Sequence, residues 1–125
     1  DYAHHPGEIS AFLSAVRQLY PDKKITAIFQ PHLYSRTKDF YIEFAESLSH
    51  SDNLILLPIY PARELPIEGV SSAMIYEKAT AKNQYLCEKE NLLDLLKDLQ
   101  PELVVSMGAG DIDRLVKPIT EFLSK

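Results

Sequence analysis

The first six residues, Asp1-Tyr2-Ala3-His4-His5-Pro6, place a carboxylate, a phenol and two imidazoles directly before a proline that can open a helix. The free N–H groups and the partial positive charge of a helix N-terminus attract phosphate, and an imidazole there can donate to a phosphoryl oxygen. Asp1 could accept hydrogen bonds from ribose hydroxyls. N-capping with a solvent-exposed histidine pair remains an alternative. Zinc is not favoured, because adjacent histidines point in different directions and no His-Glu-x-x-His spacing occurs in the sequence.

A second polar segment, Phe29-Gln30-Pro31-His32-Leu33-Tyr34-Ser35-Arg36-Thr37, follows an apolar run. Histidine, tyrosine and arginine are poor core material, so their place between a strand and a helix favours a functional loop over a surface loop with incidental polarity. Arg36 is suited to a bidentate grip on carboxylate or phosphate. The proline-rich loop Tyr60-Pro61-Ala62-Arg63-Glu64-Leu65-Pro66-Ile67 could hold Arg63 or Glu64 at a site. A surface pair between Arg63 and Glu64 is the alternative.

The segment Gly108-Ala109-Gly110-Asp111-Ile112 matches the first two glycines of a dinucleotide fingerprint, but Asp113 stands where the third glycine belongs. Close helix–strand packing and an Asp111 N-cap account for these residues without a ligand. The sequence contains no Gly-x-x-x-x-Gly-Lys-Ser/Thr loop and no Gly-x-Ser-x-Gly elbow. Cys87 falls in a strand pattern far from any motif histidine, so nucleophilic hydrolysis is not supported.

These segments need elements to position them, and hydrophobic periodicity predicts helices and strands in strict alternation. Pro6 suits the first turn of a helix, and Thr37 is a plausible N-cap for the second. We expect helices over 6–20, 38–48, 70–82, 92–99 and 112–123, and strands over 25–30, 53–59, 84–87 and 103–107.

Such alternation predicts one α/β domain, an open, mostly parallel twisted sheet with right-handed crossovers and helices on both faces. Ligands bind such sheets at the carboxyl ends of the strands. The loops over 30–37, 59–68 and 108–111 all follow strands, so we expect them to converge on one edge together with residues 1–6. The pattern begins on a helix, and we therefore expect a preceding strand upstream, in a longer protein.

Composition narrows the class of protein. Of 125 residues, 46% are hydrophobic and 25% charged, which is ordinary for a globular domain and argues against disorder. A net charge of −5 disfavours nonspecific binding to nucleic acid or a membrane surface. No apolar run approaches the roughly 20 residues that span a bilayer, and nothing reads as a secretory signal. The single Cys87 favours a reducing cytoplasm.

Taken together, four segments resemble the C-terminal domain of the Mur ligases of peptidoglycan synthesis. They are residues 1–6, 29–37, 60–64 and 108–112, in the order and spacing of that family and across essentially the whole chain. The likeness is greatest to the branch that joins L-alanine to UDP-N-acetylmuramate with ATP and Mg²⁺, through an acyl phosphate and a tetrahedral intermediate.

The resemblance implies a three-domain enzyme whose N-terminal domain binds UDP and whose central domain supplies the P-loop and most ATP and Mg²⁺ contacts. This chain, as a Rossmann-like C-terminal domain over 1–125, would close over the central domain to complete the site. The isolated chain is then expected to be inactive. No catalytic residue and no metal ligand is assigned to it.

The resemblance also implies roles for particular residues. Nucleotide contacts are expected from Asp1, Tyr2 and His4. Substrate contacts are expected from His32, Tyr34, Arg36 and Arg63. Many relatives have a second arginine where this chain has Leu33, and we hypothesise that Arg63 compensates.

Two other functions stay open. A related ligase attaches a recycled tripeptide to the same nucleotide sugar; it shares the histidine pair but is expected to lack the loop over 29–37. A non-catalytic α/β nucleotide-binding module is the alternative from another class.

Overall fold

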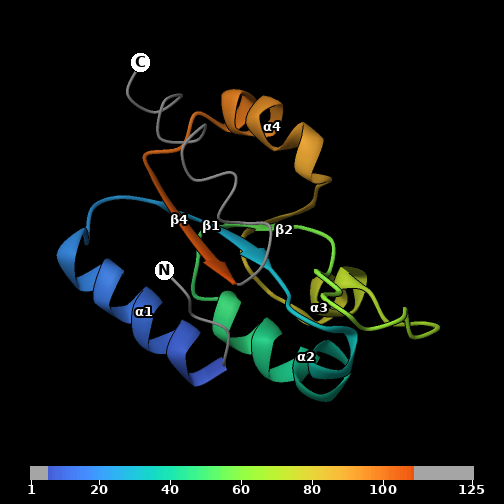
Figure 1. Cartoon of the computed structure of the whole chain (residues 1–125). Helices are drawn as coiled ribbons and strands as arrows, with labels where there is room; N and C mark the ends of the chain where they lie inside the picture. Colours follow the sequence, from blue (N-terminus) through green and yellow to red (C-terminus); the bar gives the residue numbers. More distant parts are fainter. Residues whose placement is uncertain (1–5, 109–125) are drawn as a thin grey trace.

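Helices and strands alternate along the chain in the computed structural model, which describes residues 6–108 (Figure 1). The order predicted from periodicity is confirmed over these residues, with one short 3₁₀ turn before the last helix. The elements are α1 (Pro6–Leu19), β1 (Ile25–Gln30), α2 (Tyr34–Leu48), β2 (Asn53–Leu56), α3 (Ser72–Lys78), β3 (Asn83–Leu86), η1 (Lys89–Asn91), α4 (Leu92–Leu99) and β4 (Leu103–Gly108).

The strands form one sheet in the order β3-β2-β1-β4, and every pairing is parallel. In this register Thr26 of β1 lies between Asn53 of β2 and Val104 of β4. The chain moves from β1 to β2 to β3 in one direction and then crosses back to add β4 on the other side of β1. The loops after β1 and β4 therefore leave the sheet at a topological switch point, where open α/β sheets bind ligands.

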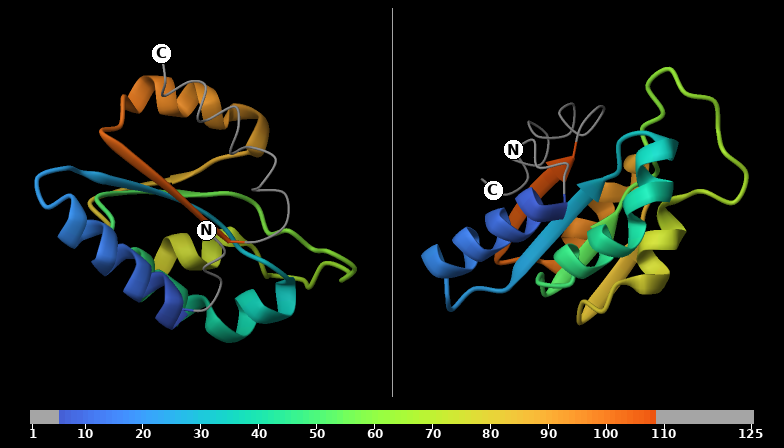
Figure 2. Two further views of the ribbon diagram at one scale, coloured as in Figure 1. Left: turned by 60° about the vertical axis from the view of Figure 1, so that its left-hand side comes forward. Right: turned by 90° about the horizontal axis from the view of Figure 1, so that it is seen from below.

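Helices cover both faces of the sheet, as predicted (Figures 1 and 2). Helices α1, α2 and α3 lie on one face, and α4 lies on the other. Strand β1 is buried along its whole length, and successive side chains serve opposite faces: Phe29 packs with Phe44 of α2, whereas Ile28 packs on the side of α4. The larger core comprises Ile9, Leu13, Val16, Ile25, Ala27, Phe29, Phe44, Ala45, Leu48, Leu54, Leu56, Ile75, Ala79 and Met107.

Three predicted elements differ from the observed ones by two residues or more at one or both ends. Helix α2 begins at Tyr34, so Thr37 is not its N-cap; the hydroxyl of Thr37 donates instead to the carbonyl of Leu33, 2.9 Å away. Strand β2 ends before Pro58, since proline has no N–H to extend the ladder. Helix α3 is seven residues long and begins at Ser72, directly after its N-cap Ser71, whose hydroxyl accepts from the N–H of Ala73.

The helix predicted over 112–123 lies outside the described residues. Within 6–108, no helix is both long and apolar enough to cross a membrane.

Candidate functional site

The candidate site is built on the carboxyl edge of the sheet, from the loops that follow β1 and β2. The two loops are joined along their backbones: the N–H of Tyr60 donates to the carbonyl of Pro31 at 2.8 Å, and the N–H of Leu33 donates to the carbonyl of Tyr60 at 2.9 Å. The rings of His32 and Tyr60 stack with their centroids 5.8 Å apart. The predicted convergence is thus confirmed for the loops after β1 and β2, whereas residues 1–5 and 109–111 lie outside the described residues.

Leu33 has an unusual backbone conformation, with φ 73° and ψ 138°. Non-glycine residues rarely adopt positive φ, and such strain, of order 1–3 kcal/mol, persists only where the surroundings enforce it and clusters at functional sites. Here the backbone bond to Tyr60 enforces it on one side and the first turn of α2 on the other, since the N–H of Thr37 donates to the Leu33 carbonyl. The strain marks the junction between the loop and the helix as a candidate functional position.

The first turn of α2 holds two predicted substrate residues, Tyr34 and Arg36. Tyr34 is the first helical residue and borders a cavity, while Arg36 is half-buried with its Nε enclosed by protein atoms. The structure therefore places Tyr34, Arg36 and His32 on one short stretch of chain at the carboxyl edge. A guanidinium held at a helix start suits binding of an anionic group.

Arg63 and Glu64 lie on the loop between β2 and α3, which projects beyond the sheet in Figure 2. Arg63 is exposed, and its predicted contact with a substrate is not tested by this arrangement. Glu64 instead contacts α2: one carboxylate oxygen accepts from the N–H of Ser35 at 3.1 Å, and the other accepts from the Ser35 hydroxyl. The sequence offered Glu64 as a site residue or as a partner of Arg63, and did not signal this bond to α2.

The bonds from Ser35 hold the pKa of Glu64 below its ordinary value, first through the hydroxyl and then through the backbone N–H. A further lowering comes from the charge of His32. Glu64 is therefore a carboxylate at neutral pH, and it places a fixed negative charge at the start of α2.

Two adjoining cavities open on this edge. The larger has a volume of ≈ 410 Å³, lies between Tyr34, the end of β2 and the start of α3, and is also lined by Cys87. The smaller has a volume of ≈ 240 Å³ and extends from Gln30 towards η1. Both are lined by Pro58, Ile59 and Glu88, so they form a continuous concave surface beside the two loops.

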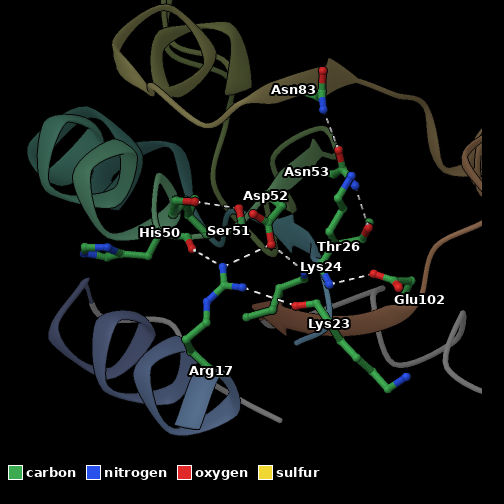
Figure 3. Close-up of polar contacts among 12 residues, drawn as sticks. Arg17, Lys23, Lys24, Thr26, His50, Ser51, Asp52, Asn53, Asn83 and Glu102 are labelled. Carbon is green, nitrogen blue, oxygen red and sulfur yellow. Dashed lines mark hydrogen bonds and ion pairs between the residues drawn. The ribbon is translucent and has the colours of Figure 1, made fainter. Parts of the chain in front are cut away.

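Another cavity, of ≈ 430 Å³, lies at the opposite edge, where the strands begin. A polar network there joins α1 to the sheet (Figure 3). Asp52 accepts from Arg17 at 3.0 Å and from the N–H of Ile25 at 2.7 Å, and the side chains of Asn53 and Asn83 are linked at 2.9 Å. These contacts supply hydrogen-bond partners for polar groups at the amino ends of the strands, which indicates a structural role for the network. The carboxyl edge therefore remains the better candidate for a functional site.

Several predicted residues lie outside the described range: Asp1, Tyr2 and His4, and the segment after Gly108. Among residues 6–108, no group of three or more histidine, cysteine, aspartate or glutamate side chains could hold a metal ion. The described part of the site offers the guanidinium of Arg36, the side chains of His32 and Tyr34, and a cavity bordered by Tyr34.

Comparison with known proteins gives a consistent picture. The family model described as "Mur ligase, glutamate ligase domain" matches residues 1–110. The UDP-N-acetylmuramate–L-alanine ligase of Parabacteroides distasonis is 55% identical over 125 residues, which are 100% of this chain and 27% of that protein. The corresponding ligase of Flavobacterium psychrophilum is 53% identical, with 100% and 28% covered. This chain thus spans about a quarter of the length of the curated relatives it matches.

Solved structures agree with the fold. The UDP-N-acetylmuramate–alanine ligase of Thermotoga maritima superposes with a TM-score of 0.73 at 28% identity, covering 99% of this chain and 26% of that one. A murein peptide ligase from Psychrobacter arcticus superposes with a TM-score of 0.70 at 17% identity, covering 98% and 26%, and this second likeness shows the fold alone.

Proposed function

The chain belongs to the Mur ligase family, and from that membership we propose that it is the C-terminal domain of a UDP-N-acetylmuramate–L-alanine ligase. In this role it acts in peptidoglycan biosynthesis in the cytoplasm, as one of three domains. The other two, an N-terminal UDP-binding domain and a central ATP-binding domain, lie outside this chain. The chain by itself is expected to show no ligase turnover.

One observation carries the choice of L-alanine ligase: identity of 55% over the whole chain to a protein of that activity. The carboxyl edge supports it. The loop over 29–37, which the tripeptide-attaching relative is expected to lack, is present, and it is fixed in place by the backbone of Tyr60.

The proposed ligase reaction requires fixed positive charge at the site. Amide formation through an acyl phosphate develops negative charge on phosphoryl and carbonyl oxygens, and preorganised cationic donors stabilise that charge. We assign Arg36 and His32 to the carboxylate-bearing substrates, L-alanine and UDP-N-acetylmuramate. Tyr34 would line the substrate cavity, and Arg63 would supply the second guanidinium that Leu33 cannot.

ATP and Mg²⁺ would be held mainly by the central domain. Mg²⁺ favours oxygen ligands and substrate phosphates, and within residues 6–108 no cluster of three or more carboxylate, histidine or cysteine side chains could hold it. The contacts of this chain with the nucleotide would come from Asp1, Tyr2 and His4. Closure of this domain over the bound nucleotide would exclude water that could hydrolyse the acyl phosphate.

The test is phosphate release by the full-length protein that contains this chain, with ATP, Mg²⁺ and UDP-N-acetylmuramate. L-alanine is supplied in one reaction and the tripeptide in another. Release that depends on L-alanine and falls in the His4→Ala and Arg36→Ala variants supports the proposal. Release with the tripeptide only would assign the protein to murein recycling, and no release with either would favour a non-catalytic binding module.

Arg63 is tested in the same assay. An Arg63→Ala variant should raise KM for UDP-N-acetylmuramate or L-alanine. Normal KM values for both substrates would remove Arg63 from the site.

A further inference from the structure

The start of α2 lacks a cap from its own sequence. The N-cap position is Leu33, whose apolar side chain offers no acceptor and whose φ is 73°. The first N–H groups of a helix have no partner within the helix, and an uncapped start frays. Arg36 lies in this first turn, so the orientation of its guanidinium depends on how firmly the turn is held.

Glu64 supplies the missing cap from 29 residues away. Its carboxylate accepts from both the N–H and the hydroxyl of Ser35, the residue directly before Arg36. A negative charge at a helix N-terminus is favoured by the helix dipole, and hydrogen bonds to an ionised acceptor are about twice as strong as neutral ones. The cap therefore ties the loop between β2 and α3 to the first turn of α2.

The loop is itself shaped to deliver this carboxylate. The N–H of Glu64 donates to the carbonyl of Pro61 at 2.9 Å, which closes a turn, and Ala62 within the turn has φ 53°. The preceding residue, Tyr60, is held by two backbone bonds to the loop after β1 and by its ring against His32. The two loops are thus joined at Pro31 and Leu33 through Tyr60, and at Ser35 through Glu64. His32 lies between the two bonds to Tyr60, and Arg36 directly follows the bond to Glu64.

We propose that Glu64 is a positioning residue: it caps α2 across the two loops and so orients Arg36 towards the carboxylate-bearing substrate. This inference rests on the proposed function for the role of Arg36. Glu64 itself need not touch the substrate. The lowered pKa of Glu64 agrees with the geometry, because an ionised cap is the form that both bonds from Ser35 favour.

The experiment uses the full-length protein and compares Glu64→Ala and Glu64→Gln with Glu68→Gln, which alters an exposed carboxylate four residues further along the same loop. The KM values for L-alanine and UDP-N-acetylmuramate are measured first in Arg36→Ala, which identifies the substrate that Arg36 binds. Glu64→Ala should raise the KM for that same substrate about tenfold, equivalent to about 1.4 kcal/mol, and leave KM for ATP unchanged. Glu64→Gln should have a smaller effect, because an amide oxygen still accepts from the Ser35 N–H. Glu68→Gln should behave as wild type.

Two features separate positioning from a general loss of structure. An unfolded fraction lowers the apparent kcat for every substrate and changes no KM. In addition, Glu64→Ala combined with Arg36→Ala should be no worse than Arg36→Ala alone, because Glu64 acts through Arg36. If the increases in KM from the two substitutions add in the double variant, the proposal that Glu64 acts through Arg36 is wrong.

Hydrogen exchange of the segment over 31–37 in the full-length protein is a readout that needs no activity. Glu64→Ala should speed exchange there, and unchanged exchange would overturn the cap. If the wild type is active and Glu64→Ala leaves its KM values unchanged, the positioning role is refuted and the proposed function is not. A wild type without phosphate release would refute the proposed function, while the exchange rates would still decide whether Glu64 anchors the turn.

Discussion

Gly108 lies against the backbone of Gln30 so closely that a Cβ on Gly108 would stand 2.3 Å from the Gln30 carbonyl oxygen. The two residues are paired partners at the carboxyl ends of β4 and β1, and Gly108 has φ +118°. Only glycine fits this conformation and this approach. The contact fixes the switch point at which the loop after β1 begins, one residue away from Pro31 and two from His32.

Gly108→Ala is therefore expected to destabilise the chain by at least about 3 kcal/mol, because backbone strain and a clash with an unyielding carbonyl add together. Urea unfolding of the purified chain measures the change. Gly7→Ala is the matched control: nothing lies within 4 Å of its added Cβ, in the first turn of α1. It should be neutral or stabilising by up to about 1 kcal/mol. Equal effects at the two glycines would contradict the structural account of Gly108.

The Asp52 carboxylate joins α1 to the sheet through Arg17 and also accepts from the N–H of Ile25 (Figure 3). Asp52→Ala should cost about 1–3 kcal/mol of unfolding free energy, mostly because a backbone N–H at the start of β1 loses its partner. Arg17→Ala should cost less, since its pair with Asp52 is partly exposed to solvent. The exposed Asp22→Ala serves as the control and should be near neutral. The prediction is wrong if Arg17→Ala proves the more damaging change.

The stabilising effect of Glu64 should depend on pH in a definite direction. Its pKa in the folded chain is below the ordinary value of 4.5, chiefly because of the Ser35 hydroxyl and backbone N–H. Its contribution is therefore fully present above pH 4.5 and is lost as pH falls through the folded pKa. The difference in stability between wild type and Glu64→Gln should be constant at neutral pH and shrink in acid. A difference that grows on acidification would contradict it.

Cys87 should react slowly with alkylating agents. Burial beside the larger cavity raises the pKa of its thiol above 9.0, with further increases from Glu88 and Glu90. Thiolate is the reactive form, so the iodoacetamide rate of the folded chain should be lower than that of the urea-unfolded chain and should rise with a midpoint above pH 9.0. Glu88→Gln should speed the reaction modestly, whereas Glu77→Gln, on α3, should not. A midpoint at or below 9.0 would refute the prediction.

Much of the fold was predictable from the order of residues because its signals are local. The apolar run at Ile25–Gln30 and the helical spacing of Ile9, Leu13 and Val16 reflect which faces must be buried. Strand–helix alternation then predicted a parallel sheet with its loops at one edge; the structure confirms the sheet, and it confirms the shared edge for the loops after β1 and β2. The start of α2 was predicted wrongly at Thr37, because the acceptor that allows the helix to begin at Tyr34 comes from a distant loop.

The sequence by itself thus determined the class of fold and the family to which the chain belongs, and it indicated the sheet edge that carries the candidate site. Burial patterns and motif order are properties of neighbouring residues, so they can be recognised in the sequence without knowing how the elements pack. Tertiary structure alone decided that Glu64 bonds to Ser35 rather than to Arg63, and that Gly108 is fixed by the carbonyl of Gln30. Both contacts join segments far apart in the chain, and their geometry exists only after the strands have paired.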